Sequence, residues 1–320
     1  MQLPTPFIRL PFRFDAEVLA AEALAVPGEQ WRAHPSGMAG NDALPLIARN
    51  GESGDDFDGP MQTTRALECM PYTRQVMASF GEVLGRSRLM RLAPGCRVAR
   101  HVDFNYHWRH HVRIHVPIIT CPRVLFHCGH ESRHLRAGDC WIFNSWLRHE
   151  VVNQGATWRI HLVVDVTGSS RFWRLVERCA TRSDDSNMSA MPVIERRPGD
   201  AHLLTERFST PGVMSPGELD GLIVELLDDL ARHPGNDTAL LAHYAQLLHD
   251  FRRDWRCHWL LHGTQPEGRD GYHALLQEVR SGLHPEPRAL VTASNGIGAN
   301  AVIAQRILAP ALSRADGHPG

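Results

Sequence analysis

Two stretches of the chain alternate strictly between aliphatic and other residues, and they restrict the fold more than any other feature. Every even position is aliphatic in residues 112–118 and again in residues 159–166. A period of two residues predicts β-strands with one face in an apolar core. The opposite faces carry the polar side chains Arg113, His115, Arg159, His161 and Asp165. A solvent-facing strand would carry lysine, glutamate and serine on its polar face. The arginines and histidines found here instead indicate the polar interior of a barrel.

Further short strands are predicted around these two. Residues 87–92 precede an Ala-Pro-Gly turn, residues 140–143 follow an Ala-Gly-Asp turn, and residues 149–152 form another short run. Several short strands at this spacing indicate an all-β sandwich or barrel. The fold class that we expect is therefore mainly β, with additional helices.

Two histidines and one aspartate are spaced as metal ligands. His101 and Asp103 are two residues apart, so on a strand they would share one face, about 7 Å from each other. His149 follows 46 residues later, and the intervening chain has room for several strands. Two histidines and one carboxylate are the ligand set of non-haem Fe(II) oxygenases, which leaves coordination positions open. The alternative is a hydrogen-bonded pair at a strand end with an unrelated histidine.

The N-terminal part combines strands, helices and a long loop. Residues 7–14 are predicted to form a strand, and Asp15 to cap a helix that ends near Val26. Residues 28–59 are rich in Gly, Pro, Asp and Asn, so we expect a loop around a short strand at residues 44–48. Long loops of this kind often act as lids. Pro71 begins a helix that should continue to about Leu84, where Gly85 would break it.

The chain changes character after about residue 182. A polar linker is predicted at residues 183–187, and leucine-rich helical periodicity follows. The expected helices cover residues 217–232, 238–251, 272–279 and 299–312. We therefore expect a β-domain at residues 1–182 and an α-helical region at residues 188–320.

Composition excludes several classes of partner. The chain has 34 Lys+Arg and 35 Asp+Glu, a net charge of −1, which gives no electrostatic basis for binding nucleic acid or a membrane surface. Seven cysteines without a C-x-x-C pair argue against a disulfide scaffold or a structural zinc site. The first residues lack the apolar core of a signal peptide, and no apolar run is long enough to span a membrane. A cytoplasmic location is expected.

Over residues 86–167 the sequence resembles the aspartyl/asparaginyl β-hydroxylase family of oxygenases that depend on Fe(II) and 2-oxoglutarate. Within that family it is similar to bacterial proline hydroxylases of the 3-hydroxylase type. The similarity depends on six motifs: His101-Val102-Asp103-Phe104, Arg113-Ile114-His115, Arg136-Ala137-Gly138-Asp139-Cys140-Trp141, His149-Glu150-Val151, Trp158-Arg159 and Val164-Asp165.

The resemblance implies a double-stranded β-helix, or jelly roll, and a role for each motif residue. His101, Asp103 and His149 would bind Fe(II). Arg159 would pair with the distal carboxylate of 2-oxoglutarate, and Arg113 and His115 would lie near the same co-substrate. A guanidinium suits a carboxylate in a site with little water. The alternative for Arg159 is a salt bridge, for example to Asp165.

The sequence says less about which residues contact the substrate. Arg91 could reach a substrate carboxylate or be an exposed strand arginine, and Trp108 is a second candidate for substrate contact.

The expected activity is hydroxylation of an amino acid or an amino-acid-derived, carrier-bound or peptide-bound substrate, with O2 consumed and succinate and CO2 released. Two alternatives remain. One is an Asp/Asn-type hydroxylase of peptides or proteins, and the other is a non-catalytic metal-binding barrel with a helical interaction module.

Overall fold

The chain forms two compact units in the computed structural model, which describes residues 2–181, 191–208 and 212–313. Unit 1 contains Met1–Asp103 and His110–Ser209, and unit 2 contains Phe104–Arg109 and Thr210–Gly320. The expected linker at residues 183–187 lies outside the described residues. The division differs from the expected one in two ways. Residues 191–208 belong to unit 1, because Ile194 bridges to Phe14 and the strand at residues 204–205 joins the large sheet. Residues 104–109 belong to unit 2.

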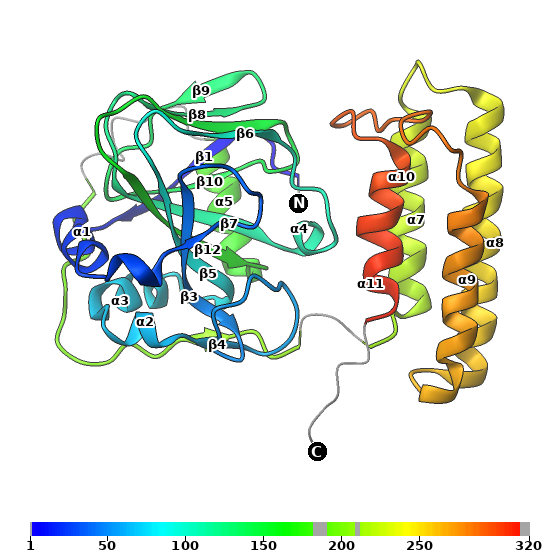
Figure 1. Ribbon diagram of the computed structural model, residues 1–320, viewed down its shortest axis with the longest axis horizontal. Helices are drawn as coiled ribbons and strands as arrows, with labels where there is room; N and C mark the ends of the chain where they lie inside the picture. Colours follow the sequence, from blue (N-terminus) through cyan, green and yellow to red (C-terminus); the bar gives the residue numbers. More distant parts are fainter. Residues whose placement is uncertain (1, 182–190, 209–211, 314–320) are drawn as a thin grey trace. The chain divides into compact units, whose positions relative to one another are not determined.

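Unit 1 is built from two antiparallel sheets (Figure 1). The path of the large sheet is β1 (Phe7–Arg13), β10 (Asp139–Phe143), β7 (Val112–Ile119), β12 (Arg159–Val166), β5 (Val83–Leu92), β3 (Asn41–Arg49) and β2 (Arg32–Ala33). Two short strands join it at the side, β4 (Met61–Thr63) on β3 and β13 (Leu204–Thr205), parallel, on β5. The small sheet has the order β6 (Arg97–His101), β11 (His149–Asn153), β8 (Val124–Cys128) and β9 (Glu131–Arg133).

From β5 onward the chain passes repeatedly between the two sheets. β5, β7, β10 and β12 lie in the large sheet, and β6, β8, β9 and β11 lie in the small one. This alternation defines a double-stranded β-helix, so the predicted fold class is confirmed. The two strictly alternating sequence stretches are β7 and β12, which pair with each other at the centre of the large sheet.

Each face of the large sheet has its own apolar core. The even-numbered side chains of β7 and β12 pack with the helices α1 (Ala16–Leu24), α3 (Pro71–Ser79) and α5 (Ser170–Ala180). The space between the sheets is filled by a smaller cluster that includes Phe126, Trp141 and Phe143. The buried His115, Arg159, His161 and Asp165 and the partly buried Arg113 lie on this inner side, as the alternation predicted. The interior of the barrel is therefore partly polar.

Two local predictions need correction. The helix that begins at Pro71 ends at Ser79, not near Leu84, because Gly81 adopts φ +67° and stops it four residues before Gly85. Residues 83–92 are instead the strand β5. The stretch at residues 28–59 holds more strand than expected, since β3 covers nine residues and pairs with β5. The remaining loops are residues 34–40, between β2 and β3, and residues 50–60, between β3 and β4. The other short helical segments of this part are η1 (Gly28–Gln30) and α2 (Arg65–Glu68).

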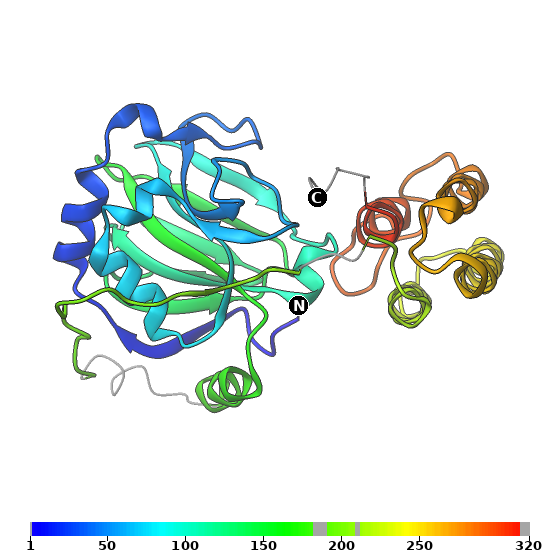
Figure 2. The same cartoon turned by 90° about the horizontal axis from the view of Figure 1, so that it is seen from below.

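Unit 2 is helical, as expected. Its elements are α7 (Pro216–Ala231), α8 (Thr238–His262), η2 (Pro266–Gly268), α9 (Arg269–Gly282), α10 (Ala299–Val302), η3 (Ile303–Leu308) and α11 (Ala309–Ala311), and Figure 2 shows its long helices nearly end-on. They surround a core with Trp255, Tyr244 and Tyr272 fully buried. Phe104 and Tyr106 pack against that core, and Arg109 forms ion pairs with Glu218 and Glu225. The segment that directly follows Asp103, including much of α4 (His107–His110), is thus part of the helical unit.

No helix among the described residues is long and apolar enough to cross a membrane. The seven cysteines are all free thiols, in agreement with the prediction that the chain is no disulfide scaffold.

Candidate metal centre

His101 and His149 are brought together by strand register. They are direct partners in the antiparallel pair of β6 and β11, and their ring centroids lie 4.2 Å apart. Opposite residues of an antiparallel pair place their side chains on the same face of the sheet. The 47 residues between them therefore return the chain to the first histidine, as the sequence spacing allowed.

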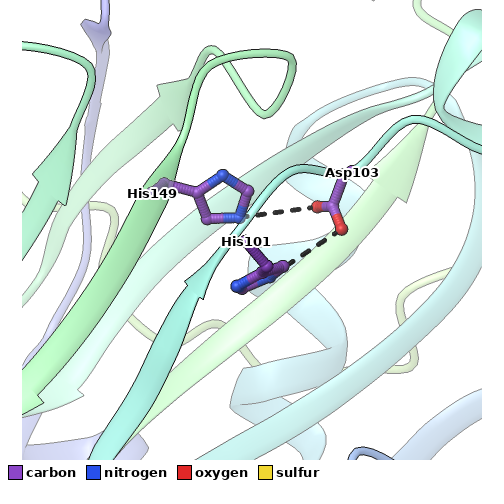
Figure 3. A group of neighbouring side chains, drawn as sticks. All are labelled: His101, Asp103 and His149. Carbon is purple, nitrogen blue, oxygen red and sulfur yellow. Dashed lines mark ion pairs between the residues drawn. The ribbon is translucent and has the colours of Figure 1, made fainter. Parts of the chain in front are cut away.

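Asp103 completes the cluster from outside the strand. β6 ends at His101, so the expectation that both residues lie on one strand is wrong. The loop instead turns the carboxylate back toward the histidines, and the Asp103 amide donates to the carbonyl of Ser145 at 3.0 Å. The Asp103 oxygens lie 3.9 Å from His101 Nε2 and 3.8 Å from His149 Nε2 (Figure 3). One potential ligand atom from each of the three residues falls within 4.8 Å of the other two.

Backbone carbonyls orient both imidazoles. His101 Nδ1 lies 2.8 Å from the Ala99 carbonyl oxygen, and His149 Nδ1 lies 2.9 Å from the Leu147 carbonyl oxygen. A carbonyl can only accept, so each Nδ1 carries a proton, and in a neutral ring Nε2 then presents a lone pair toward Asp103. Burial lowers the pKa of His149 to about 4, so the ring is neutral at neutral pH. These are the tautomer and protonation state that a metal ligand needs.

The three side chains fit Fe(II) by chemistry as well as by geometry. Two imidazoles and one carboxylate are a ligand set that would leave the other side of a bound ion open. His149 is buried, whereas the His101 side chain is 39% exposed, so the site is accessible from solvent on one side.

A row of rings leads from His149 to Arg159. His149 packs against Phe143 at 4.8 Å between centroids, Phe143 against His115 at 5.1 Å, and His115 against His161 at 6.0 Å. Arg159 then donates from Nη2 to His161 Nδ1 at 2.6 Å. Residues far apart in sequence thus line one continuous strip of the barrel interior.

This strip holds polar atoms that have no hydrogen-bond partner among the described residues. They are Arg159 Nε, His161 Nε2, both ring nitrogens of His115, and Trp141 Nε1. Arg159 is 4% exposed and has no carboxylate partner in the described part of the chain. Burial lowers its pKa, but a guanidinium remains a cation at neutral pH. A buried cation beside unpaired donors fits the distal carboxylate of 2-oxoglutarate.

The remaining predicted residues fall in different places. Arg113 pairs with Asp165 through two hydrogen bonds, at 2.6 and 2.8 Å, so Arg159 is not the partner of that carboxylate. Arg91 lies 2.8 Å from Asp42 and stacks between Trp31 and Trp158. Trp108 is buried in α4, within the segment that belongs to unit 2.

Two buried arginines on β5 were missed by sequence reasoning. Arg86 and Arg88 are 5% and 2% exposed, and they lie near the Arg113–Asp165 pair. Their signal is an Arg-Ser-Arg run at a period of two in a predicted strand, which is the pattern that identified the polar faces of β7 and β12.

A double-stranded β-helix with two histidines and one carboxylate close together is an arrangement typical of metal-dependent oxygenases. Residues 17–168 match the model of the aspartyl/asparaginyl beta-hydroxylase family. This match confirms the resemblance seen in the sequence motifs and indicates an oxygenase enzyme. No curated protein matches the chain.

Several solved structures are similar at low sequence identity. An oxidoreductase of the 2OG-Fe(II) oxygenase family from Burkholderia pseudomallei is 15% identical, with a TM-score of 0.38 over 51% of this chain and 85% of that one. A prolyl-4-hydroxylase from Pseudomonas putida is 14% identical, with a TM-score of 0.33 over 51% of this chain and 92% of that one. HygX from Streptomyces hygroscopicus, with nickel, 2-oxoglutarate and hygromycin B bound, is 12% identical. Its TM-score is 0.34, over 50% of this chain and 82% of that one. The assignment of the ligands does not depend on these similarities.

Proposed function

We propose that the protein is an Fe(II)- and 2-oxoglutarate-dependent hydroxylase of an amino acid or an amino-acid-derived substrate. His101, Asp103 and His149 would hold Fe(II), and Arg159 with His115 would bind 2-oxoglutarate. The observation that carries the proposal is the combination of the ligand cluster with a buried, carboxylate-free Arg159 at the end of the same interior strip.

The bound iron and 2-oxoglutarate would supply the oxidising power, with one oxygen atom of O2 entering the substrate and the other entering succinate as CO2 leaves. The protein residues have three tasks. The Ala99 and Leu147 carbonyls hold the imidazole tautomers, Arg159 fixes the keto acid by its far carboxylate, and the apolar rings around His115 keep water away from the reacting atoms.

The first test needs no substrate. Fe(II) and then 2-oxoglutarate are added to metal-free protein in the absence of oxygen, and the visible charge-transfer band of a chelated iron–keto acid complex is measured. The wild-type protein and the control variant Arg148→Ala, whose side chain is exposed beside His149, should both develop the band. Arg159→Ala should need at least about tenfold more 2-oxoglutarate, because a charge-assisted pair is lost. Iron binding without a band in the wild type would remove the co-substrate from the proposal.

The activity is then tested by substrate-dependent succinate release with a panel of free amino acids and short peptides. Release with free amino acids supports the proposed substrate class. Release only with peptides that contain Asp or Asn would replace it with a peptide hydroxylase. Metal binding without 2-oxoglutarate binding would leave a non-catalytic barrel.

A further inference from the structure

One short loop supports two of the three proposed metal ligands. We call residues 144–148, which connect β10 to β11, the 144–148 loop. The carbonyl of Ser145 accepts a hydrogen bond from the Asp103 amide at 3.0 Å, and the carbonyl of Leu147 lies 2.9 Å from His149 Nδ1. These two carbonyls are two residues apart in the chain. The conformation of the loop therefore determines where a carboxylate ligand and an imidazole ligand are held.

Asn144 forms the turn at the start of this loop. Its carbonyl oxygen accepts from the Leu147 amide at 3.0 Å, which closes a four-residue turn. Its side-chain Oδ1 accepts from the Trp146 amide at 3.2 Å. Asparagine is favoured at the first position of such turns, because its side chain can bond to the backbone two residues later. A single residue thus fixes the turn that presents both supporting carbonyls.

One peptide plane links the Asn144 side chain to Asp103. The Ser145 carbonyl and the Trp146 N–H belong to the same trans peptide unit, so they point in opposite directions. The N–H donates to Asn144 Oδ1 on one side, and the carbonyl accepts from the Asp103 amide on the other. The plane can rotate only if one of these two hydrogen bonds breaks. Loss of the Asn144 side chain would therefore release the acceptor that keeps Asp103 turned toward the histidines.

The Asn144 side chain is itself held by the segment before β1. Its Nδ2 donates to the Leu3 carbonyl at 2.9 Å, and its backbone N–H donates to the Pro6 carbonyl at 2.9 Å. Asn144 is buried, so solvent water does not readily replace these partners. The carboxamide uses its oxygen for the turn and its nitrogen for the N-terminal segment. Both ends of this side chain therefore contribute to the position of the loop.

A second asparagine, at the other end of β11, shows what a purely structural role requires. Asn153 Oδ1 accepts from the Gly155 amide, two residues later, at 2.9 Å. Its Nδ2 donates to the carbonyls of Leu92 and Thr157, each at 2.9 Å, and the residue is fully buried. None of these partners belongs to the metal cluster. Comparison of Asn144 with Asn153 thus separates support of the fold from support of the ligands.

We propose that Asn144 is a positioning residue for the metal centre, because it holds the 144–148 loop so that Asp103 and His149 converge before a metal binds. This rests on the metal site of the proposed function. The effect is transmitted through the backbone carbonyls of the loop and not through a contact between Asn144 and the ion.

The first measurement is hydrogen exchange in the metal-free protein. Asn144→Ala removes both side-chain hydrogen bonds, so the Asp103 amide should exchange at least about tenfold faster than in the wild type, relative to amides at the centre of β12. The reference amides correct for a change in global stability. Asn153→Ala is the control, and its relative Asp103 exchange rate should stay within about twofold of the wild-type rate.

The second measurement is anaerobic titration of Fe(II) into the metal-free variants. Asn144→Ala should bind Fe(II) at least about tenfold more weakly than the wild type, which is the usual effect of removing a group that orients metal ligands. Asn153→Ala should bind within about twofold of the wild type, even where urea unfolding shows that it is the less stable variant. Equal Fe(II) affinities of Asn144→Ala and the wild type would overturn the proposal.

Asn144→Ser provides a test that does not depend on the folding of Asn144→Ala. A serine hydroxyl can accept from the amide two residues later, but it is too short to reach the Leu3 carbonyl as well. The Fe(II) affinity of Asn144→Ser should therefore be about threefold below that of the wild type and above that of Asn144→Ala. Asn153→Ser is the matched control. Equal affinities of the two serine variants would contradict the proposal.

These results separate the positioning role from the proposed function. If the wild type and Asn144→Ala bind Fe(II) equally and both develop the band with 2-oxoglutarate, the hydroxylase assignment stands and Asn144 only stabilises the fold. If the wild-type protein binds no Fe(II), the metal site itself fails and Asn144 has no ligands to position.

Discussion

His101 and His149 face each other across the β6–β11 pair, with ring centroids 4.2 Å apart and each Nδ1 held by a backbone carbonyl two residues earlier. Because the same i−2 hydrogen bond occurs on both strands, the backbone orients the two imidazoles without a metal. The orientation of the imidazoles is therefore a property of the backbone, and a substitution at either position removes a ligand without disturbing the other.

The first prediction concerns this pair. His149→Ala should lower the affinity for Fe(II) by more than about 100-fold and abolish turnover, because two of three ligands no longer define a facial site. Fe(II) is titrated anaerobically into metal-free protein. His127→Ala on the neighbouring strand β8 is the control, since its ring contacts Ser132 and not the cluster. An Fe(II) affinity for His149→Ala equal to that of the control would remove His149 from the metal site.

The second prediction concerns pH and stability. Burial lowers the pKa of His161 far below 6.5, so the folded protein keeps this ring neutral while the unfolded chain binds a proton below about pH 6.5. The unfolded state then binds more protons than the folded state, and the free energy of unfolding must fall as the pH decreases through this range. One such histidine lowers the free energy of unfolding by up to about 1.4 kcal/mol for each pH unit of acidification in this range.

The measurement is urea unfolding of the metal-free protein from about pH 7.5 down to about pH 5. In His161→Gln the free energy of unfolding should fall less steeply toward low pH, because the unfolded chain binds one proton fewer. His130→Gln, which changes a ring that is 83% exposed, should leave the profile unchanged. An identical slope in wild type and His161→Gln would show that His161 is protonated in the folded state.

The parts of this structure that follow from local chemistry could be predicted from the sequence. The alternation in β7 and β12 required an apolar face and a polar face, and the helical periodicity after residue 217 required the core of unit 2. The end of the helix at Ser79 was mispredicted because two glycines, Gly81 and Gly85, were available as breakers, and only the backbone φ shows which one acts.

Features that depend on tertiary packing could not be predicted from the sequence. The position of Asp103 depends on its amide bonding to Ser145, 42 residues away, rather than on a strand of its own. The assignment of Phe104–Arg109 to the helical unit depends on partners more than 100 residues later, such as Glu218 and Glu225. No local pattern encodes contacts at that separation.

The third prediction separates packing from binding at Arg91. Its guanidinium pairs with Asp42 and lies 4.6 and 4.5 Å from the ring centroids of Trp31 and Trp158. Arg91→Ala should lower the free energy of unfolding by about 1–3 kcal/mol, because a charge-assisted hydrogen bond and two cation–π contacts are lost. Fe(II) and 2-oxoglutarate affinities should not change.

Urea unfolding and calorimetry measure the two effects in the same samples. Arg123→Ala, an exposed arginine before β8, is the control for stability. If Arg91→Ala leaves the free energy of unfolding unchanged but binds amino acids more weakly, Arg91 contacts the substrate, as the sequence led us to expect.

The last prediction concerns Asp165, the buried counter-ion of Arg113 on β7. Asp165 is fully buried and accepts both hydrogen bonds from Arg113, with Arg86 Nε 3.9 Å away. Asp165→Asn removes a fully buried carboxylate from beside Arg113 and Arg86, so the free energy of unfolding should fall by about 3–5 kcal/mol. Combining it with Arg113→Gln restores the original charge difference, and the double variant should be more stable than Asp165→Asn alone. The two variants are compared by urea unfolding at neutral pH. A double variant less stable than Asp165→Asn would mean that Arg113 stabilises the barrel through contacts other than its pairing with Asp165.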